Sequence, residues 1–181
     1  MEGLGFDPLP YYREAPLPDE QYPLALFMGV REDAYFQTGQ RHVSELRQRI
    51  PLPKMFIHRE DAASLHLTDD DWVEIETRAG KMKAAVEIRA DMPQGLVRVP
   101  HGWWLPETKS GKDHLSGAWN FSDAMITCDD DEYLDREQGI PHLKGVPCRV
   151  SRCADPRSDD DELGERALSP TDEQEPVTAE G

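Results

Sequence analysis

WVEIETRAGKMKAAVEIR, residues 72–89, is the stretch of sequence that decides the fold. On both sides of Ala79-Gly80, apolar and polar side chains alternate, which predicts two β-strands that each turn one face to a core. A two-residue connection that contains glycine predicts that these strands form a hairpin. The side chains expected on the buried face are Val73, Ile75, Thr77, Met82, Ala84, Val86 and Ile88.

Shorter apolar runs on either side of the hairpin predict further strands. They lie at 22–28, 55–58, 96–101 and 146–151. Helical spacing of apolar residues predicts short helices at 41–49 and 59–67, and Asp70 in the following turn suits a left-handed backbone. About six short strands with two or three short helices indicate a mainly-β domain, a closed or nearly closed β-barrel rather than a parallel α/β sheet.

The ends of the chain differ from the middle in composition. Residues 1–20 hold four prolines, which disfavour helix and interior strand, so we expect an extended arm before a folded domain at 21–154. From 155 to 181, ten Asp or Glu stand against two Arg, a net charge of −8 out of −16 for the 181-residue chain. We expect a disordered acidic tail, because this segment has too little apolar surface to offset its ordering entropy. A docking tail for a basic partner is the alternative.

The charge and the cysteines argue against several classes of protein. A net charge of −16 disfavours nucleic-acid and membrane-surface binding. Cys128, Cys148 and Cys153 form no close cluster of the kind that holds zinc or an iron–sulfur centre, and their odd number fits reduced thiols better than a disulfide framework. No apolar run approaches membrane-spanning length. The sequence therefore predicts a cytoplasmic protein without membrane insertion.

Six segments follow one another in an order that is typical of one known family. They are YPLALFMGVR (22–31), YFQTGQRHVSELR (35–47), HREDAASLHLTDDDWVEIETRAG (58–80), PHGWW (100–104), WNFSDAMITCDDD (119–131) and LKGVPCRV (143–150). Together they make the chain resemble the C-terminal molybdopterin-dinucleotide-binding domain of the molybdopterin (DMSO-reductase-type) oxidoreductases. The resemblance implies a six-stranded double-psi β-barrel, which agrees with the strand count.

The resemblance also implies a cofactor, molybdopterin guanine dinucleotide, in which a pterin is joined through a pyrophosphate to guanosine. Phosphates need Arg, Lys or backbone N–H groups, and flat heterocycles need polar edges. Carried over to this sequence, the cofactor-binding candidates are Gly29, Arg31, Tyr35, Gln37, Thr38, Arg41, His101, Gly102, Trp103, Asn120, Ser122, Asp123 and Lys144. Molybdenum or tungsten would be held by partner domains, so no catalytic or metal-ligating residue is expected in this chain.

These candidates have structural alternatives. Arg41 is expected to bind a phosphate, and Lys144 a phosphate or a pterin carbonyl, with little effect of either on fold stability. In the alternative, Thr38 caps a helix, Trp103 packs the end of the barrel, and short polar side chains such as Ser122 cap a loop.

Two hypotheses on function come from different classes. In the first, the chain is a cofactor-binding domain or small subunit of a molybdenum or tungsten oxidoreductase with two molybdopterin guanine dinucleotides. It closes over one side of the cofactor, is not catalytic alone, and needs a larger catalytic subunit. The alternative is a double-psi-barrel protein-interaction module without cofactor. The first hypothesis requires that Gly29, the segment 37–41 and the segment 101–122 lie on the same side of the molecule.

Overall fold

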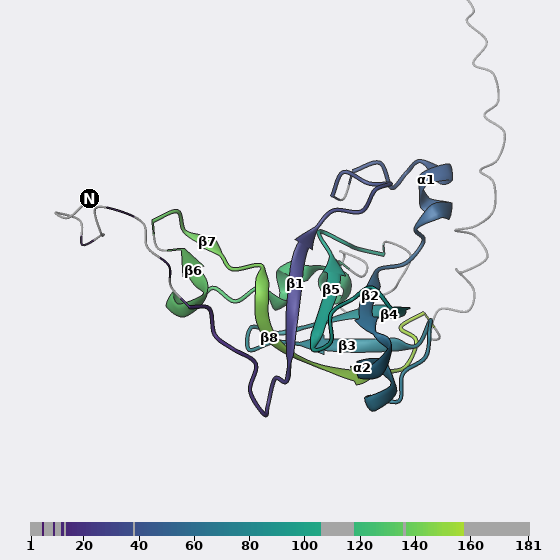
Figure 1. Ribbon diagram of the computed structural model, residues 1–181. Helices are drawn as coiled ribbons and strands as arrows, with labels where there is room; N and C mark the ends of the chain where they lie inside the picture. Colours follow the sequence, from purple (N-terminus) through teal and green to yellow (C-terminus); the bar gives the residue numbers. More distant parts are fainter. Residues whose placement is uncertain are drawn as a thin grey trace, which may run out of the picture.

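The computed structural model describes residues 14–37, 39–105, 118–135 and 137–157, together with Gly5, Leu9 and Tyr12. Within these ranges the chain forms a closed barrel with the strand order β1-β5-β2-β4-β3-β8 (Figure 1). The strands are β1 (Leu24–Val30), β2 (Lys54–His58), β3 (Trp72–Glu76), β4 (Lys81–Arg89), β5 (Leu96–Pro100) and β8 (Lys144–Arg152). β1 pairs in parallel with β5, and β2 with β4, while the other neighbours are antiparallel. The predicted six-stranded double-psi β-barrel is confirmed.

Short helices and a small hairpin occupy the connections. They are α1 (Ser44–Arg49), α2 (Arg59–Ser64), α3 (Ala118–Phe121), the 3-10 helices η2 (Asp123–Ile126) and η3 (Asp131–Tyr133), and the strands β6 (Leu134–Asp135) and β7 (Ile140–Pro141). α1 begins later than expected, because Gln40 has a φ of 69° and the chain turns there. α2 ends early for the same reason, since His66 has a φ of 56°. β6, β7 and the 3-10 helices were not predicted, because such short elements carry no periodic signal.

The two ends of the chain are described only in part. Residues 14–20 contain no helix or strand, and the Asp19 carboxylate then accepts hydrogen bonds from the backbone N–H groups of Gln21 and Tyr22, both at 2.8 Å, just before β1. The expected acidic tail falls almost entirely after Arg157, outside the residues that the structure describes. No helix within the described ranges is long and apolar enough to cross a membrane.

The hairpin predicted at 72–89 is present, but its turn lies one residue earlier than expected. Glu76 pairs with Lys81, and the backbone N–H of Thr77 donates a hydrogen bond of 3.0 Å to the Gly80 carbonyl, so the connection is Arg78-Ala79 and not Ala79-Gly80.

Val73 lies opposite Ala84 and Ile75 opposite Met82, so that the apolar side chains of both strands share one face. That face is the inside of the barrel, where Val73, Ile75 and Ala84 are completely buried. Closing the sheet into a barrel lets the six strands bury this face together, which a two-stranded hairpin could not do alone.

A second apolar cluster lies outside the barrel. It consists of Ala34, Tyr35, Trp72, Ala85, Trp103, Leu105 and Phe121. Trp72 and Ala85 are register partners on the outer side of β3 and β4, and the Trp72 ring meets that of Phe121 edge-on at 5.9 Å between centroids. The segments that follow β1 and β5, together with α3, therefore pack against the outside of the barrel. Trp72 was expected on a polar face, and this packing is why it is buried.

The end of the hairpin holds η2 in place. The Thr77 hydroxyl donates a hydrogen bond of 2.9 Å to the carbonyl of Ile126, in a buried position. Gly80 lies so close to the backbone of Met125 that a Cβ atom there would be 2.4 Å from the Met125 carbonyl oxygen. The hairpin thus fixes the 3-10 helix that opens with Asp123.

The thiols provide a test of barrel closure. Cys148 is completely buried, and burial raises its pKa to about 12, so its reactive thiolate scarcely forms at neutral pH. Cys128 is 1% exposed, whereas Cys153, after β8, is only half-buried. In the folded chain we expect limiting iodoacetamide to alkylate Cys153 and to leave Cys128 and Cys148 unmodified until denaturant is added, as read by mass spectrometry. Rapid alkylation of Cys148 in the folded chain would contradict the closed barrel.

Candidate functional site

Asp123 is a buried carboxylate at which three separate parts of the chain meet. Its Oδ2 atom accepts a hydrogen bond from the backbone N–H of Gly29 at 3.3 Å and lies 2.8 Å from Nδ1 of His101. Its Oδ1 atom accepts a hydrogen bond from the backbone N–H of Gly102 at 2.9 Å. Asp123 is only 2% exposed. One carboxylate therefore joins the end of β1, the residues after β5, and the first residue of η2.

The parallel pairing of β1 with β5 brings the first two of these parts together. Both strands end at the same end of the barrel, where Val30 lies opposite Pro100, and Figure 1 shows them side by side. The backbone N–H of His101 continues the pairing with a hydrogen bond of 2.9 Å to the Val30 carbonyl. Because ligands commonly bind at loops mounted on strand ends, this end of the barrel is the candidate site.

Gly29 makes the close approach at this end possible. Its φ is 72°, a left-handed conformation that glycine adopts without steric cost. A Cβ atom at this position would lie 2.9 Å from Cδ1 of Leu143, the residue that precedes β8. The carbonyl of Leu143 also accepts a hydrogen bond of 2.7 Å from Met28. Leu143 was not predicted as a site residue, because nothing in the sequence distinguishes an apolar side chain that packs against a distant glycine from any other apolar residue.

Arg41 is held inside the chain, next to this end of β5. Its guanidinium lies 4.0 Å from the centroid of the Trp103 ring and 5.4 Å from that of Tyr35. It donates hydrogen bonds to the carbonyl oxygens of Trp104 and, at 3.3 Å, Gly102. Arg41 is 8% exposed. A buried guanidinium that binds two backbone carbonyls and lies on an aromatic ring can hold this loop in place, which is a structural alternative to the predicted phosphate contact.

Tyr35 and Trp103 form the aromatic part of the same cluster. Their rings meet edge-on at 5.5 Å between centroids, and the Tyr35 hydroxyl donates a hydrogen bond of 2.9 Å to the carbonyl of Ile50. Burial raises the pKa of Tyr35, an effect that the nearby Arg41 opposes. The Nε1 atom of Trp103 is buried and has no hydrogen-bond partner among the described residues. It is an indole N–H donor left unsatisfied in a predicted cofactor loop.

The other predicted residues lie around this cluster but are not joined to it. Arg31 and Gln37 are exposed, and the guanidinium of Arg31 lies 5.0 Å from the centroid of the Phe36 ring. Lys144 is exposed at the start of β8, directly after Leu143. Thr38 lies outside the described residues.

The remaining two candidates belong to the segment that enters η2. Asn120 is half-buried in α3. The hydroxyl of Ser122 accepts a hydrogen bond of 3.3 Å from the backbone N–H of Ala124. Ser122 therefore caps η2, which is the structural role considered as the alternative to cofactor binding. Within the described ranges, no three His, Cys, Asp or Glu side chains gather as a metal site requires.

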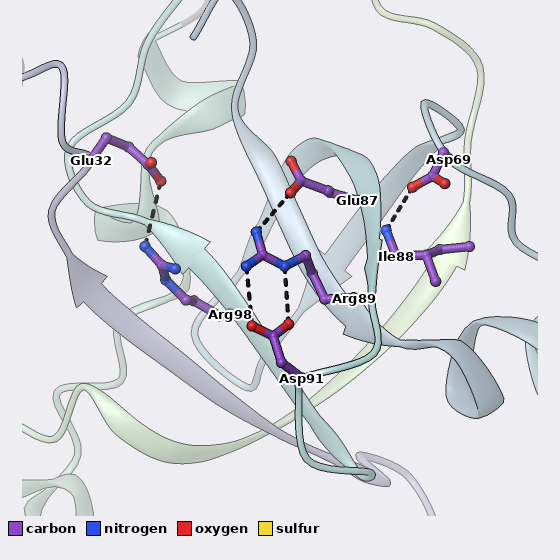
Figure 2. Close-up of polar contacts among 7 residues, drawn as sticks. All are labelled: Glu32, Asp69, Glu87, Ile88, Arg89, Asp91 and Arg98. Carbon is purple, nitrogen blue, oxygen red and sulfur yellow. Dashed lines mark hydrogen bonds and ion pairs between the residues drawn. The ribbon is translucent and has the colours of Figure 1, made fainter. Parts of the chain in front are cut away.

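A second charged area lies on the outside of the barrel, across β2, β4 and β5, and we call it the Phe56 face. The guanidinium groups of Arg98 and Arg89 lie 4.7 and 5.2 Å from the centroid of the Phe56 ring. Arg98 is paired with Glu32 at 3.8 Å and Arg89 with Glu87 at 3.1 Å, and Figure 2 shows these residues. The cations of this face already have carboxylate partners.

The Phe56 face is a poor site for a pyrophosphate. A pocket of about 190 Å³ beside Phe56 has four charged lining residues, Glu32, Arg49, Lys54 and Glu87, whose charges balance. Burial raises the pKa of Glu32, while Arg98 opposes this rise. Because phosphate sites need an excess of donors and positive charge, the strand ends near Asp123 are the better candidate.

Comparisons with known proteins agree with the family that the sequence resembles. A family model described as the Molydopterin dinucleotide binding domain matches residues 25–146. The chain therefore belongs to this family, whose members bind a molybdopterin dinucleotide.

Two relatives and one solved structure show how the chain compares with larger proteins. It is 42% identical over 163 residues to "Acetylene hydratase" of Syntrophotalea acetylenica, covering 84% of this chain and 22% of the relative. It is 30% identical over 149 residues to "Dopamine dehydroxylase" of Eggerthella lenta, covering 78% of this chain and 14% of the relative. The solved acetylene hydratase from Pelobacter acetylenicus superposes with a TM-score of 0.75 at 40% identity, covering 84% of this chain and 22% of that one. The chain thus spans less than a quarter of each relative's length.

The buried position of Arg41 leads to a prediction on stability. Arg41→Ala should lower the free energy of unfolding by about 2–4 kcal/mol, because charged hydrogen bonds and a ring contact are lost from a buried place. Arg41→Lys should not restore it, since an ammonium cannot reproduce the planar two-carbonyl contact. Arg31→Ala, which removes an exposed guanidinium, is the control and should cost less than about 1 kcal/mol. Denaturant titration followed by tryptophan fluorescence measures both, and equal effects at the two positions would contradict the placement.

Proposed function

We propose that this chain is the cofactor-binding portion, as a domain or a small subunit, of a molybdenum or tungsten oxidoreductase that carries two molybdopterin guanine dinucleotides. It closes over one side of the cofactor with the residues near Asp123 at the ends of β1 and β5. The rest of the active site, including the ligands of the metal, belongs to a larger portion beyond this chain.

The observation that carries the proposal is the convergence of predicted cofactor segments on one buried carboxylate. Three parts of the chain meet at Asp123. Its carboxylate contacts Gly29, His101 and Gly102 at distances of 3.3 Å or less.

The sequence-based hypothesis required Gly29, the segment 37–41 and the segment 101–122 to share one side of the molecule. Gly29 and Gly102 are joined through Asp123, and Arg41 donates hydrogen bonds to the carbonyls of Gly102 and Trp104. Their common position supports a shared pocket. A module with the same barrel would also bring the ends of β1 and β5 together, so the cofactor test below distinguishes the two functions.

The groups around this end of the barrel fit the chemistry of the cofactor. Arg31 and Lys144 are exposed cations next to Gly29 and Leu143, and they suit the pyrophosphate. The buried N–H of Trp103 and the half-buried amide of Asn120 suit polar atoms of a heterocycle. When bound, the cofactor supplies the metal centre at which the reaction occurs, and this chain supplies binding groups and orientation.

The size of the chain and its exposed apolar side chains support a larger partner portion. The match covers 22% of acetylene hydratase and 14% of dopamine dehydroxylase. Phe36, in the segment after β1, is 62% exposed, and Trp119, in α3 just before the site, is 49% exposed. Large apolar side chains in such positions suit contact with further domains, because contact would remove them from water.

Co-expression with a larger chain that lacks this portion tests the proposal. We expect the chain alone to carry no pterin and the purified pair to release oxidised, fluorescent pterin. Arg31→Ala with Lys144→Ala should lower the pterin content of the pair at least about tenfold, because charged contacts to phosphate are lost. The thermal transition of the chain should hardly move, since both side chains are exposed.

The control is Arg89→Ala on the Phe56 face, compared with each single variant. It removes one positive charge, as Arg31→Ala or Lys144→Ala does, and should leave the pterin content unchanged. An active pair that retains pterin without residues 21–154 of this chain would overturn the proposal.

A further inference from the structure

We propose that Asp123 is a positioning residue that holds His101 in the tautomer with its proton on Nδ1, so that Nε2 accepts a hydrogen bond from an N–H group of the bound heterocycle. The inference rests on the proposed function for the identity of the ligand, but the tautomer itself can be measured without any ligand.

The contacts of Asp123 determine which nitrogen of His101 carries the proton. A carboxylate offers only acceptor oxygens, so a ring nitrogen that lies 2.8 Å from Oδ2 must present an N–H to it. The backbone N–H groups of Gly29 and Gly102 hold the two carboxylate oxygens in position from two sides. Asp123 therefore cannot turn away from the imidazole without breaking contacts to two strand ends.

The opposite edge of the His101 ring is available to a ligand. The His101 side chain is 35% exposed, whereas that of Asp123 is 3% exposed, so the ring lies between the buried carboxylate and the surface. Nε2 has no hydrogen-bond partner in the part of the chain that the structure describes. In a neutral imidazole with its proton on Nδ1, Nε2 is an acceptor.

An acceptor at this position distinguishes between parts of a dinucleotide. The pterin and guanine rings carry N–H and NH₂ donors, whereas ionised phosphates carry only acceptors. With its proton on Nδ1, His101 would bind a heterocycle edge and would be unsuited to the pyrophosphate. The opposite tautomer would reverse this preference, since Nε2–H could donate to a phosphate oxygen. By fixing the tautomer, Asp123 decides which part of the ligand the His101 ring recognises.

His58 provides an internal reference of the opposite kind. Its Nδ1 atom accepts a hydrogen bond of 3.2 Å from the backbone N–H of Glu60 at the start of α2, so its proton must be on Nε2. The two histidines of the same chain are thus expected to show opposite patterns of ring protonation.

Long-range ¹H–¹⁵N spectra of the full chain at alkaline pH, where imidazoles are neutral, distinguish the two tautomers. We expect a bare Nε2 in His101 and a bare Nδ1 in His58, with the signals assigned by His101→Phe and His58→Phe. Asp123→Asn should move the His101 proton to Nε2 if the amide oxygen keeps the shorter hydrogen bond from Gly102, because the NH₂ group then takes the place of Oδ2 and donates to Nδ1. Asp69→Asn is the matched control: Asp69 also accepts a backbone hydrogen bond, of 2.6 Å from Ile88 (Figure 2), and its loss should leave His101 unchanged.

The ligand part of the inference is read from the pterin content of the co-expressed pair. Asp123→Asn and His101→Phe should each lower it by about tenfold, the loss expected for one hydrogen bond of about 1.4 kcal/mol. His101→Phe retains an aromatic ring but has no ring nitrogen, and it provides the pterin measurement if Asp123→Asn does not fold. A wild-type His101 with its proton on Nε2, or full pterin retention in His101→Phe, overturns the inference. A wild-type pair that carries no pterin overturns the proposed function instead, and leaves the tautomer result standing.

Discussion

The hydrogen bonds to the Asp123 carboxylate are the interaction on which the candidate site depends. Burying an ionised carboxylate costs free energy unless donors replace the lost water, and Asp123 has two backbone N–H groups and one imidazole around it. These donors belong to the ends of two parallel strands, which the barrel topology places side by side. The closed barrel therefore places the two strand ends side by side, and the Asp123 carboxylate holds the residues at these strand ends in position. A pocket made of loops needs such a fixed point to bind a ligand in one orientation.

The sequence predicted most of the barrel but not the packing outside it. Alternation over 72–89 identifies a hairpin because successive side chains of a strand point to opposite faces. The structure has that hairpin with the expected inward faces, although its turn is at Arg78-Ala79 and not at Ala79-Gly80. The same rule placed Trp72 on a polar face. It is buried because the segments after β1 and β5 pack over the outside of β3 and β4, and Phe121 covers it. Periodicity tells which side chains share a face, but not whether loops cover that face.

The candidate residues could be selected from the sequence, but the sequence could not show which of them contact other parts of the chain and which are free to contact a ligand. Gly29 was selected for close backbone approach, and its left-handed φ against Leu143 agrees with that reason. Asp123 and Arg41 were selected as groups that face the ligand, yet both satisfy groups of the chain itself. Spacing along a sequence cannot show whether a polar side chain binds a ligand or a neighbouring loop. The chain is similar to relatives that are named for different reactions, acetylene hydratase and dopamine dehydroxylase.

Hydrogen–deuterium exchange of the assembled pair, compared with the chain alone, tests most directly whether the strand ends near Asp123 form the cofactor pocket. The backbone amides at 29–31, 101–104 and 120–124 should become protected together when the pterin-loaded pair forms. Their protection should be lost when the pair is prepared without cofactor, while amides at the contact with the larger chain stay protected. Protection confined to the Phe56 face, with no change at these three segments, would contradict a cofactor role and would identify the barrel as a protein-interaction module.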